Sequence, residues 1–278
     1  MIDILMATYN GERYLREQLD SIFAQTCEDW QLLIRDDNST DSTCRILAEY
    51  VAKYPTKVRV VDEGGSRLGA SLNFGRLLEY SDSDYIMFSD QDDVWLPSKI
   101  ELSLGMMKAA EYLYPATPLL VHSDLKVVDA NLSPVEESMW RRLRVSPRLG
   151  DNASDLMVQG LVSGCALMIN RKARKISTPI PREAIMYDWW ISIRVATHGK
   201  IIYMSLPTLL HRLHRMNTVG VTRVDANYFA RKLMHLNAQF RAYREVLAMI
   251  EKTGHPVTFP WFIRRKTHTV IGKFLYHL

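Results

Sequence analysis

The chain has 278 residues, of which 47% are hydrophobic and 24% are charged, a composition that excludes an intrinsically disordered protein. This length fits one large domain or two closely packed ones. The three cysteines, Cys27, Cys44 and Cys165, are too few and too scattered for a disulfide framework or a zinc site, which fits a reducing cytoplasm.

The net charge of +4 is unevenly distributed along the chain. Residues 221–278 carry ten Lys or Arg and three acids, which leaves a net charge of −3 on the rest. A basic tail on a slightly acidic body predicts an anionic partner, and we expect no nucleic acid. No apolar stretch is long enough to span a membrane, and the opening "MIDILMATYN" predicts a strand rather than a signal peptide. We therefore expect a cytoplasmic protein.

The first 105 residues alternate between strand-like and helix-like patterns. Apolar runs of strand length cover 2–8, 31–37, 57–61 and 84–90, and helical apolar faces lie between them in 11–25, 46–51 and 70–80. Such alternation predicts an α/β fold with a parallel, doubly wound sheet flanked by helices.

Polar clusters follow three of these strands. They are Thr8-Tyr9-Asn10, Asp36-Asp37 and Asp90 to Asp93. Ligands of doubly wound sheets bind outside the carboxyl ends of the strands, so we expect the three clusters to converge on one binding edge.

The second half of the chain is less regular. We expect a strand pair or a strand and a turn in 118–129, a loop with a short helix in 133–155, a buried strand in 161–170, a helix in 185–199, a strand in 200–204 and a tail helix in about 226–251.

The stretch "FSDQDDVW" at 88–95 places Asp90, Asp92 and Asp93 directly after an apolar strand. Two carboxylates about 4 Å apart repel each other by roughly 4 kcal/mol at an effective dielectric constant near 20. Water, a basic partner or a bound cation must offset this repulsion. Mg²⁺ and Mn²⁺ prefer such oxygen ligands, and they leave positions open for phosphate oxygens.

Two common nucleotide-binding motifs are missing. Neither G-x-G-x-x-G after the first strand nor G-x-x-x-x-G-K-[ST] occurs, which argues against ordinary dinucleotide oxidoreductases and P-loop NTPases. A nucleotide diphosphate would still find an acceptor for its base in Asp36 or Asp37, and a metal at the acid cluster would neutralise its diphosphate.

The segments "ATYNGERYLREQLDSI", "RDDNSTD", "FSDQDDVW", "YDWW" and "HRLHRMNTVG" occur in the order seen in family-2 glycosyltransferases, which this chain resembles over roughly residues 1–220. The resemblance is greatest to bacterial enzymes of the rhamnosyltransferase type that build surface polysaccharides. It implies an inverting enzyme with the GT-A fold, in which a Rossmann-like, mostly parallel central sheet is flanked by helices, here followed by a helical basic tail. It also implies a nucleotide-sugar-binding subdomain in 1–105 and an acceptor-binding and catalytic subdomain in 106–220, and the tail in 221–278, which lies outside the resemblance, is expected to be a third part.

The resemblance also implies roles for individual residues. Thr8, Tyr9, Asp36, Asp37, Arg67 and Asp90 would bind the donor nucleotide; Asp90, Asp92 and His214 would hold Mn²⁺ or Mg²⁺; Asp188 would be the catalytic base; and Asp93, Trp95, Gly164, Trp189 and Trp190 would support the site or border the acceptor. His214 belongs to an R-x-H-x-x-N-x-x-G segment that starts at Arg212. The partners would be a nucleotide-diphosphate sugar and a saccharide or lipid-linked oligosaccharide acceptor.

Several residues have structural alternatives. Asp36-Asp37 and Asp188 would also suit helix starts, His214 would also suit a structural role, and Cys165 is expected to be a buried hydrophobe. His122 and Asp124 are either donor-sugar neighbours or loop residues. Two other functions stay open: a sugar nucleotidyltransferase, and a non-catalytic nucleotide-sugar-binding protein.

The tail combines "RRK" at 264–266 with the apolar residues Trp261, Phe262, Ile263, Ile271, Phe274, Leu275 and Tyr276. This mixture suits a segment that lies on an anionic membrane, which would make the protein peripheral on the inner face of the cell membrane. Dimerisation through the same apolar residues and a solvated basic helix are the alternatives.

Overall fold

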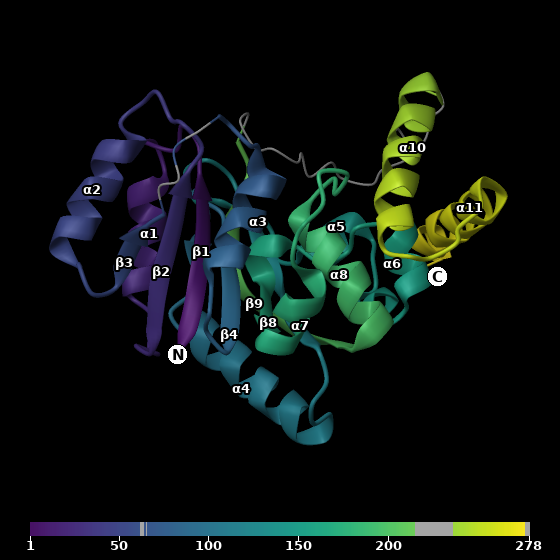
Figure 1. The fold of residues 1–278 in the computed structure, drawn as a ribbon, viewed down its shortest axis with the longest axis horizontal. Coiled ribbons are helices and arrows are strands. Elements are labelled where there is room, and N and C mark those ends of the chain that lie inside the picture. The colour runs from purple at the N-terminus through teal and green to yellow at the C-terminus, as the bar shows by residue number, and fades with distance from the viewer. Residues whose placement is uncertain (62–63, 65, 215–235, 276–278) are drawn as a thin grey trace.

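The computed structural model describes residues 1–61, 64, 66–214 and 236–275. These residues form one central sheet with helices on both faces (Figure 1). The strands of the described part are β1 (Ile2–Thr8), β2 (Trp30–Asp36), β3 (Val58–Val60), β4 (Tyr85–Ser89), β5 (Val94–Trp95), β6 (Leu119–Val128), β7 (Pro134–Glu136), β8 (Leu167–Asn170) and β9 (Lys200–Arg212).

The helices of the described part lie between and after these strands in the chain. They are α1 (Leu15–Phe23), α2 (Thr43–Lys53), α3 (Ala70–Tyr80), α4 (Lys99–Leu113), α5 (Met139–Leu143), α6 (Ala153–Val158), α7 (Arg171–Ser177), α8 (Tyr187–His198), α10 (Leu236–Lys252) and α11 (Phe259–Leu275), together with two short 3₁₀ helices, η1 (Pro147–Asp151) and η2 (Gly164–Ala166).

The strands run in the order β3-β2-β1-β4-β8-β6-β9-β5, and β7 pairs with β6. The pairs among β3, β2, β1 and β4 are all parallel, as the alternating pattern of the first 105 residues predicts. β8 then pairs antiparallel with both β4 and β6, and β6 pairs in parallel with β9. Because β8 reverses the direction twice, β4, β6 and β9 all end at the same edge of the sheet.

Two strand predictions can be compared with the structure. Residues 119–128 form a single strand that a turn follows, which is one of the two alternatives predicted for 118–129, whereas the strand predicted at 200–204 was too short, since it continues to Arg212. The register of the β6–β9 pairing shifts near Asp124, which pairs with Pro207. Because of these shifts, the pairing of the two strands continues beyond the proline. In contrast, the strand predicted at 161–170 starts at Leu167, because residues 164–166 form η2.

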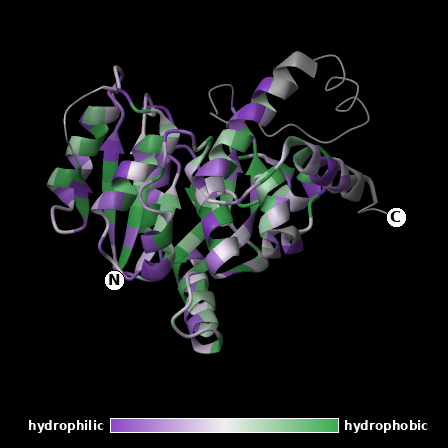
Figure 2. Ribbon diagram, turned by 45° about the vertical axis from the view of Figure 1, so that its right-hand side comes forward, coloured by the Kyte–Doolittle hydropathy of each residue, from purple (hydrophilic) through white to green (hydrophobic). Residues whose placement is uncertain are grey.

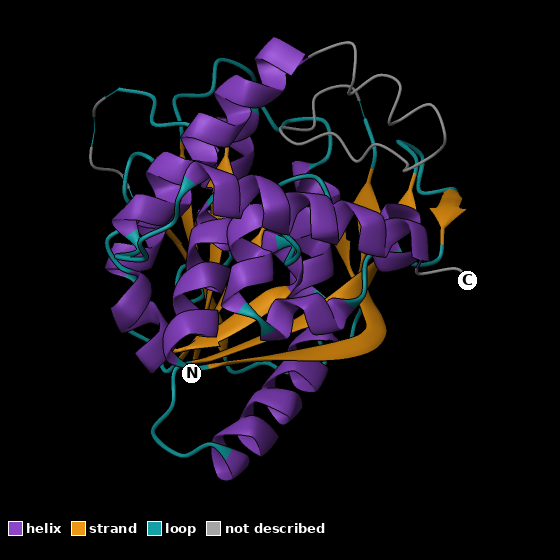
Figure 3. Cartoon of the chain, turned by 90° about the vertical axis from the view of Figure 1, so that its right-hand side faces the viewer, coloured by secondary structure: helices purple, strands orange, loops and turns teal. Residues whose placement is uncertain are grey.

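Each face of the sheet has its own hydrophobic core. The core on one face is formed with α1, α2, α4 and Met139 of α5, and the core on the other with α3, α6, α7, α8, α10 and α11. Figure 2 shows the green of hydrophobic residues along the central strands, and Figure 3 shows the helices packed over the sheet. The buried apolar residues of these helices therefore pack in the cores on the two faces of the sheet, as far as their side chains are described.

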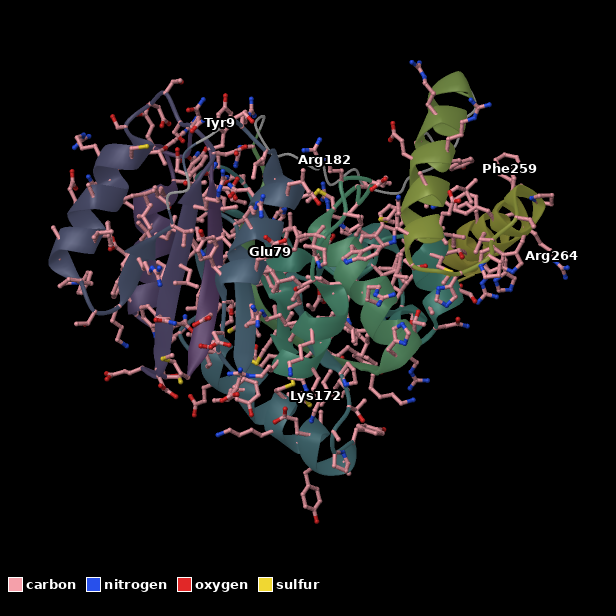
Figure 4. All side chains as sticks on the ribbon, viewed as in Figure 1. Tyr9, Glu79, Lys172, Arg182, Phe259 and Arg264 are labelled. Carbon is pink, nitrogen blue, oxygen red and sulfur yellow. The ribbon has the colours of Figure 1, made fainter. Side chains whose placement is uncertain are left out.

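The C-terminal helices pack on the body of the protein. Phe262 is fully buried, Arg265 forms a bidentate salt bridge with Asp155 of α6 (2.9 and 2.8 Å), and Lys266 Nζ donates to the carbonyl of Val158 (2.6 Å). Phe262, Arg265 and Lys266 therefore face the protein, which corrects their assignment to a membrane-facing surface. Arg264 stays exposed and points outward (Figure 4).

The tail is only partly covered by the described residues. The predicted start of its first helix, 226–235, lies outside them, as do Tyr276 and the side chains of Ile271, Phe274 and Leu275. Among the helices that the structure describes, none is both long and apolar enough to cross a membrane.

Candidate active site

The polar clusters after β1, β2 and β4 meet at the carboxyl edge of the sheet, as predicted. Thr8 and Asp36 are register partners, and Thr8 Oγ1 donates to Asp36 Oδ1 (2.8 Å). Gln91, between Asp90 and Asp92, links the third cluster to the first: its side chain accepts from the Tyr9 amide and donates to the Tyr9 carbonyl (both 2.9 Å). Tyr9 lies where the strands end (Figure 4).

The two adjacent acids after β2 have different surroundings. Asp36 also accepts from the amide and hydroxyl of Ser39 (2.7 and 2.6 Å). Asp37 is 3% exposed and accepts from the amides of Leu68 and Gly69 (2.7 and 2.8 Å) and from Arg35 (3.2 Å). Neither caps α2, whose first amide donates to Asp41 instead (2.9 Å), so the helix-start alternative is wrong.

The loop before α3 reaches over this edge. Arg67 lies 3.6 Å above the centre of the Tyr9 ring, and its Nε is 3.7 Å from Asp37 Oδ2. The predicted nucleotide-side residues Tyr9, Asp37 and Arg67 are thus brought together, with an aromatic face, a carboxylate and a cation side by side.

The three acids after β4 are neutralised to different degrees. Asp93 is fully buried and accepts from His211 Nδ1 (3.0 Å) and from the amide of Arg212 (3.2 Å). Asp92 Oδ2 contacts His214 Nε2 at 2.8 Å. The carboxylate of Asp90 has no hydrogen-bond partner among the residues that the structure describes.

The titration of these groups follows their surroundings. Burial and the charges of Asp93 and Asp92 raise the pKa of Asp90 well above its ordinary value. Burial opposes the protonated form of His211, but the carboxylate of Asp93 outweighs it and raises the pKa of His211 to about 9. Asp93 and His211 therefore form a buried ion pair, while among the described residues Asp90 has only the nearby charge of His211 to offset its burial and the charges of its acidic neighbours.

Two residues next to the predicted His214 also hold the acid loop. Arg212 is buried, and its side chain donates to the carbonyls of Asp92 and Ala130 (both 2.9 Å) and pairs with Glu17. Arg212 was predicted only as a member of the motif, and His211 was not assigned to the site. Their pairing with residues about 120 positions earlier leaves no local signal in the sequence.

Asp188 is the second residue of α8, close to the acid loop. Its carboxylate accepts from the amides of Gly164 (2.8 Å) and Trp189 (2.7 Å). Burial raises the pKa of Asp188 to about 6, although these two amides favour the ionised form. The negative charge of Asp188 in turn contributes to the raised pKa of Asp90, which indicates that the two carboxylates share one region. A place at the start of a helix was the structural alternative for Asp188. Asp188 does lie at the start of α8, and it is also close to the acid loop.

The residues around Asp188 include one that the sequence left unassigned. Tyr187 is fully buried against Phe74 and Phe88, and its hydroxyl has no hydrogen-bond partner among the described residues. A Cβ at Gly164 would lie 2.0 Å from this hydroxyl. Gly164 therefore leaves room for Tyr187 and at the same time holds Asp188 through its amide.

The predicted tryptophans divide between surface and core. Trp189 is partly exposed and packs beside Gly160. Trp190 is 5% exposed, donates to the carbonyl of Ser177 (2.8 Å) and belongs to the core, so it does not border a pocket as predicted. Trp95 is also a core residue and supports the acid loop from behind.

The remaining candidates have structural surroundings. Cys165 is buried, as expected, and lies next to Asp93 and His211. His122 is buried, and burial lowers its pKa to about 4. Asp124 is buried and accepts from the amides of Met139 and Trp140 at the start of α5 (3.1 and 3.3 Å), which favours a structural role over a sugar contact.

The chain is similar in sequence to known proteins. Residues 3–176 match the family described as Glycosyl transferase family 2. The chain is 30% identical over 226 residues to the dTDP-rhamnosyl transferase RfbG of Shigella flexneri, covering 77% of this chain and 73% of that protein. It is 29% identical over 107 residues to the UDP-Glc:alpha-D-GlcNAc-diphosphoundecaprenol beta-1,3-glucosyltransferase WfgD of Escherichia coli, covering 38% and 41%.

A solved structure supports the fold. The mannosyltransferase PcManGT from Pyrobaculum calidifontis, in complex with GDP-Man and Mn²⁺, superposes with a TM-score of 0.55 at 15% identity, over 99% of this chain and 84% of that one. This likeness and the family match confirm the predicted α/β fold of the GT-A type. The chain therefore belongs to glycosyl transferase family 2 and is an inverting glycosyltransferase.

Proposed function

We propose that this chain transfers a sugar from a nucleoside-diphosphate donor to a hydroxyl of a saccharide acceptor during bacterial surface polysaccharide synthesis, with Asp188 as the catalytic base. The observation that carries the proposal is the position of Asp188 near Asp90, whose carboxylate has no hydrogen-bond partner in the described part of the chain, together with the pKa of about 6 of Asp188. A base with such a pKa is ionised at neutral pH and still accepts a proton readily.

The donor nucleotide would bind at the carboxyl edge of β1 and β2. The Tyr9 ring offers a stacking face for the base, with Thr8 beside it, and Asp37 or Asp36 would accept its imide hydrogen. Arg67 already lies over Tyr9 and would move against the base or its phosphates. The name of the Shigella relative makes deoxythymidine-diphosphate rhamnose the first donor to test, and uridine-diphosphate hexoses come next.

A divalent metal, Mn²⁺ or Mg²⁺, fits the acid loop. Asp90 lacks a protein partner among the described residues, and one carboxylate oxygen of the buried Asp93 is also unpaired. Asp90 and Asp92 would hold the ion with His214, an oxygen-rich set that suits either metal. When bound, the ion would supply positive charge to the departing diphosphate. The presence of Mn²⁺ with GDP-Man in PcManGT supports this choice.

The protein's own groups account for the proton transfer. The amides of Gly164 and Trp189 hold the Asp188 carboxylate in one orientation, ready to accept the proton of the attacking hydroxyl. Attack from the face opposite the diphosphate gives inversion in one displacement. Trp189 would border the acceptor, whereas the hydroxyl of Tyr187 would help to keep the region around Asp188 closed to water.

The acceptor would be a saccharide linked to a lipid through diphosphate, as the name of the Escherichia relative states for that enzyme. The protein would then work at the inner face of the membrane, where exposed arginines of the C-terminal helices, Arg241, Arg244 and Arg264, would attract anionic lipids. Co-sedimentation with vesicles that contain phosphatidylglycerol tests this. Replacing the three arginines by glutamate should abolish pelleting, and a wild-type chain that stays in the supernatant would remove the membrane proposal. Dimerisation is the alternative use of this surface, and sedimentation velocity would detect it.

The central test is a thermal-shift screen of nucleotide sugars with and without Mn²⁺. A donor at about 100 times its dissociation constant should add roughly 2.7 kcal/mol to the free energy of unfolding. We expect stabilisation by one nucleotide class that depends on Mn²⁺, followed by sugar transfer. A protein that no nucleotide sugar stabilises would contradict the proposed function.

A further inference from the structure

A cavity of about 680 Å³ opens between β6, β9, α5 and η1, outside the residues assigned so far. Its walls combine two aromatic rings, Trp140 and Tyr203, with the cations Lys126, Arg141 and Arg148. This volume lies in the range of small-molecule sites, about 300–1,000 Å³, while the lining is more polar and more charged than is usual for such sites.

The cavity lies on the same face of the sheet as Asp188. Leu120 of β6 packs in the core shared with α8, and alternation along the strand places His122, Asp124 and Lys126 on that face too. Asp124 and Lys126 line the cavity.

The cavity also lies at the level of Asp188 along the strands. The end of α8 leads directly into β9, whose first residue pairs with Leu119 at the start of β6. Going backwards from the start of β9, the 12 residues of α8 therefore extend about 18 Å toward the carboxyl edge of the sheet. From Leu119 to Asp124, β6 extends about 17 Å toward the same edge. Asp188 and Asp124, which lines the cavity, thus lie at similar positions along the strand direction.

The lateral distance between the two is short. Gly164, whose amide holds Asp188, directly precedes β8, and β8 is the neighbour of β6 in the sheet. Adjacent strands are about 4.8 Å apart. A saccharide of two or three rings that lies in the cavity would therefore place one end beside Asp188.

The charges of the cavity favour an anionic ligand. Glu137 pairs with Lys126 (2.8 Å), and the carboxylate of Asp124 is already engaged by the amides at the start of α5. Among the described residues, neither acid forms a salt bridge with Arg141, whose side chain is exposed at the rim. Arg148 Nε contacts the hydroxyl of Tyr203 (3.4 Å), which places a second guanidinium at the aromatic wall.

The two rings provide a surface for sugars. Trp140 and Tyr203 meet edge to face, with ring centroids 6.0 Å apart and an interplanar angle of 82°. Trp140 is fixed from behind by His122, at a centroid distance of 5.6 Å. The apolar faces of pyranose rings pack against such aromatic walls, and guanidinium groups bind phosphate oxygens in pairs.

We propose that this cavity is the acceptor subsite, in which Trp140 and Tyr203 contact the sugar rings and Arg141 and Arg148 bind the phosphate groups that link the saccharide to its lipid. The assignment rests on the proposed function, because it names the place and the chemistry of the acceptor of that reaction. The recognised class is a saccharide with a diphosphate at its reducing end.

Calorimetric binding of two synthetic ligands to the full chain tests the proposal. One ligand is N-acetylglucosamine linked to an alkyl chain through diphosphate, and the other is the neutral alkyl glycoside of the same sugar. We expect the diphosphate ligand to bind about tenfold more tightly or better, because charge-assisted contacts to phosphate are stronger than neutral ones. The double variant Arg141→Ala with Arg148→Ala should lose this preference, and Tyr203→Ala should weaken both ligands equally.

Matched controls are available on α7, none of whose residues lines the cavity. Lys172 and Lys175 of α7 are exposed, and Lys172 is labelled in the lower half of Figure 4. Replacing both by alanine removes the same charge and should keep the preference. Equal binding of the two ligands, binding of neither, or a preference that survives in the arginine variant would overturn the assignment. The thermal-shift screen reports donor binding separately, so a failure of the acceptor subsite and a failure of the proposed function are distinguishable.

Discussion

Replacing Asp188 by Asn tests the assignment of the base most directly. Asn keeps the shape of the side chain and can still accept a hydrogen bond from the amide of Gly164 or Trp189, but it cannot accept a proton. A positioned general base contributes about 10²- to 10⁴-fold to the rate. We therefore expect kcat to fall by about that factor, while the affinity for the donor, measured by thermal shift, stays unchanged.

The pH dependence of the wild-type enzyme provides a second measurement of the same group. Because burial raises the pKa of Asp188 to about 6, the ionised base is lost as the pH falls through 6. Below that value, kcat/KM should decrease about tenfold per pH unit, and above it the rate should reach a plateau. A profile that stays flat down to pH 4 would contradict the assignment.

Stability separates lost chemistry from lost structure. The pKa of Asp188 is about 6 in the folded state, above the value of about 3.9 for an unperturbed aspartate. Between these values the folded protein binds more protons than the unfolded chain, so the free energy of unfolding falls as the pH rises, by about 3 kcal/mol across the whole window. The neutral Asn avoids this loss, and the variant should melt no earlier than wild type at pH 8. An inactive variant that also melts much earlier would refute the reasoning, since misfolding would then explain the inactivity.

Three further predictions concern other parts of the molecule. Asp92→Ala should remove the effect of Mn²⁺ on donor-induced thermal stabilisation, and a shift that still depends on Mn²⁺ would exclude Asp92 as a ligand. Gly164→Ala should reduce kcat at least tenfold, because the added Cβ meets the Tyr187 hydroxyl beside the base, whereas Gly105→Ala on the open surface of α4 should leave kcat unchanged and stabilise the protein by about 0.5–1 kcal/mol. Arg265→Ala should lower the free energy of unfolding by about 2 kcal/mol, measured by urea denaturation, because it leaves a buried carboxylate unpaired; an unchanged midpoint would show that α11 is not held by this salt bridge.

The sequence predicts the donor edge of the fold well, because the signals there are local. Apolar runs followed at once by polar clusters place Thr8, Asp36 and Asp90 at strand ends, and parallel pairing then brings these ends together. The partners of the acid loop could not be predicted in the same way. His211 reaches Asp93 only because the two-residue strand β5 pairs with the far end of β9. No periodic pattern in the sequence predicts this pairing.

The proposed acceptor cavity could not be predicted from the sequence for a similar reason. Trp140 lies in a polar segment without a regular period, and Tyr203 belongs to a strand predicted to end one residue later. Their contact depends on Asp124, which fixes the start of α5 against β6. The sequence shows an acid within an apolar strand and predicts a short helix somewhere in 133–155, but it does not show that this acid lies at the start of that helix.

β9 connects the two halves of the proposed site. Its middle supplies Tyr203 to the wall of the cavity, and its end supplies His211 and Arg212 to the acid loop. A substitution that displaces β9 is therefore expected to disturb acceptor and donor binding together, even when the side chain touches only one of them. The arginines of α5 and η1 lie outside this strand, so their removal separates the two half-sites in a way that changes within β9 cannot.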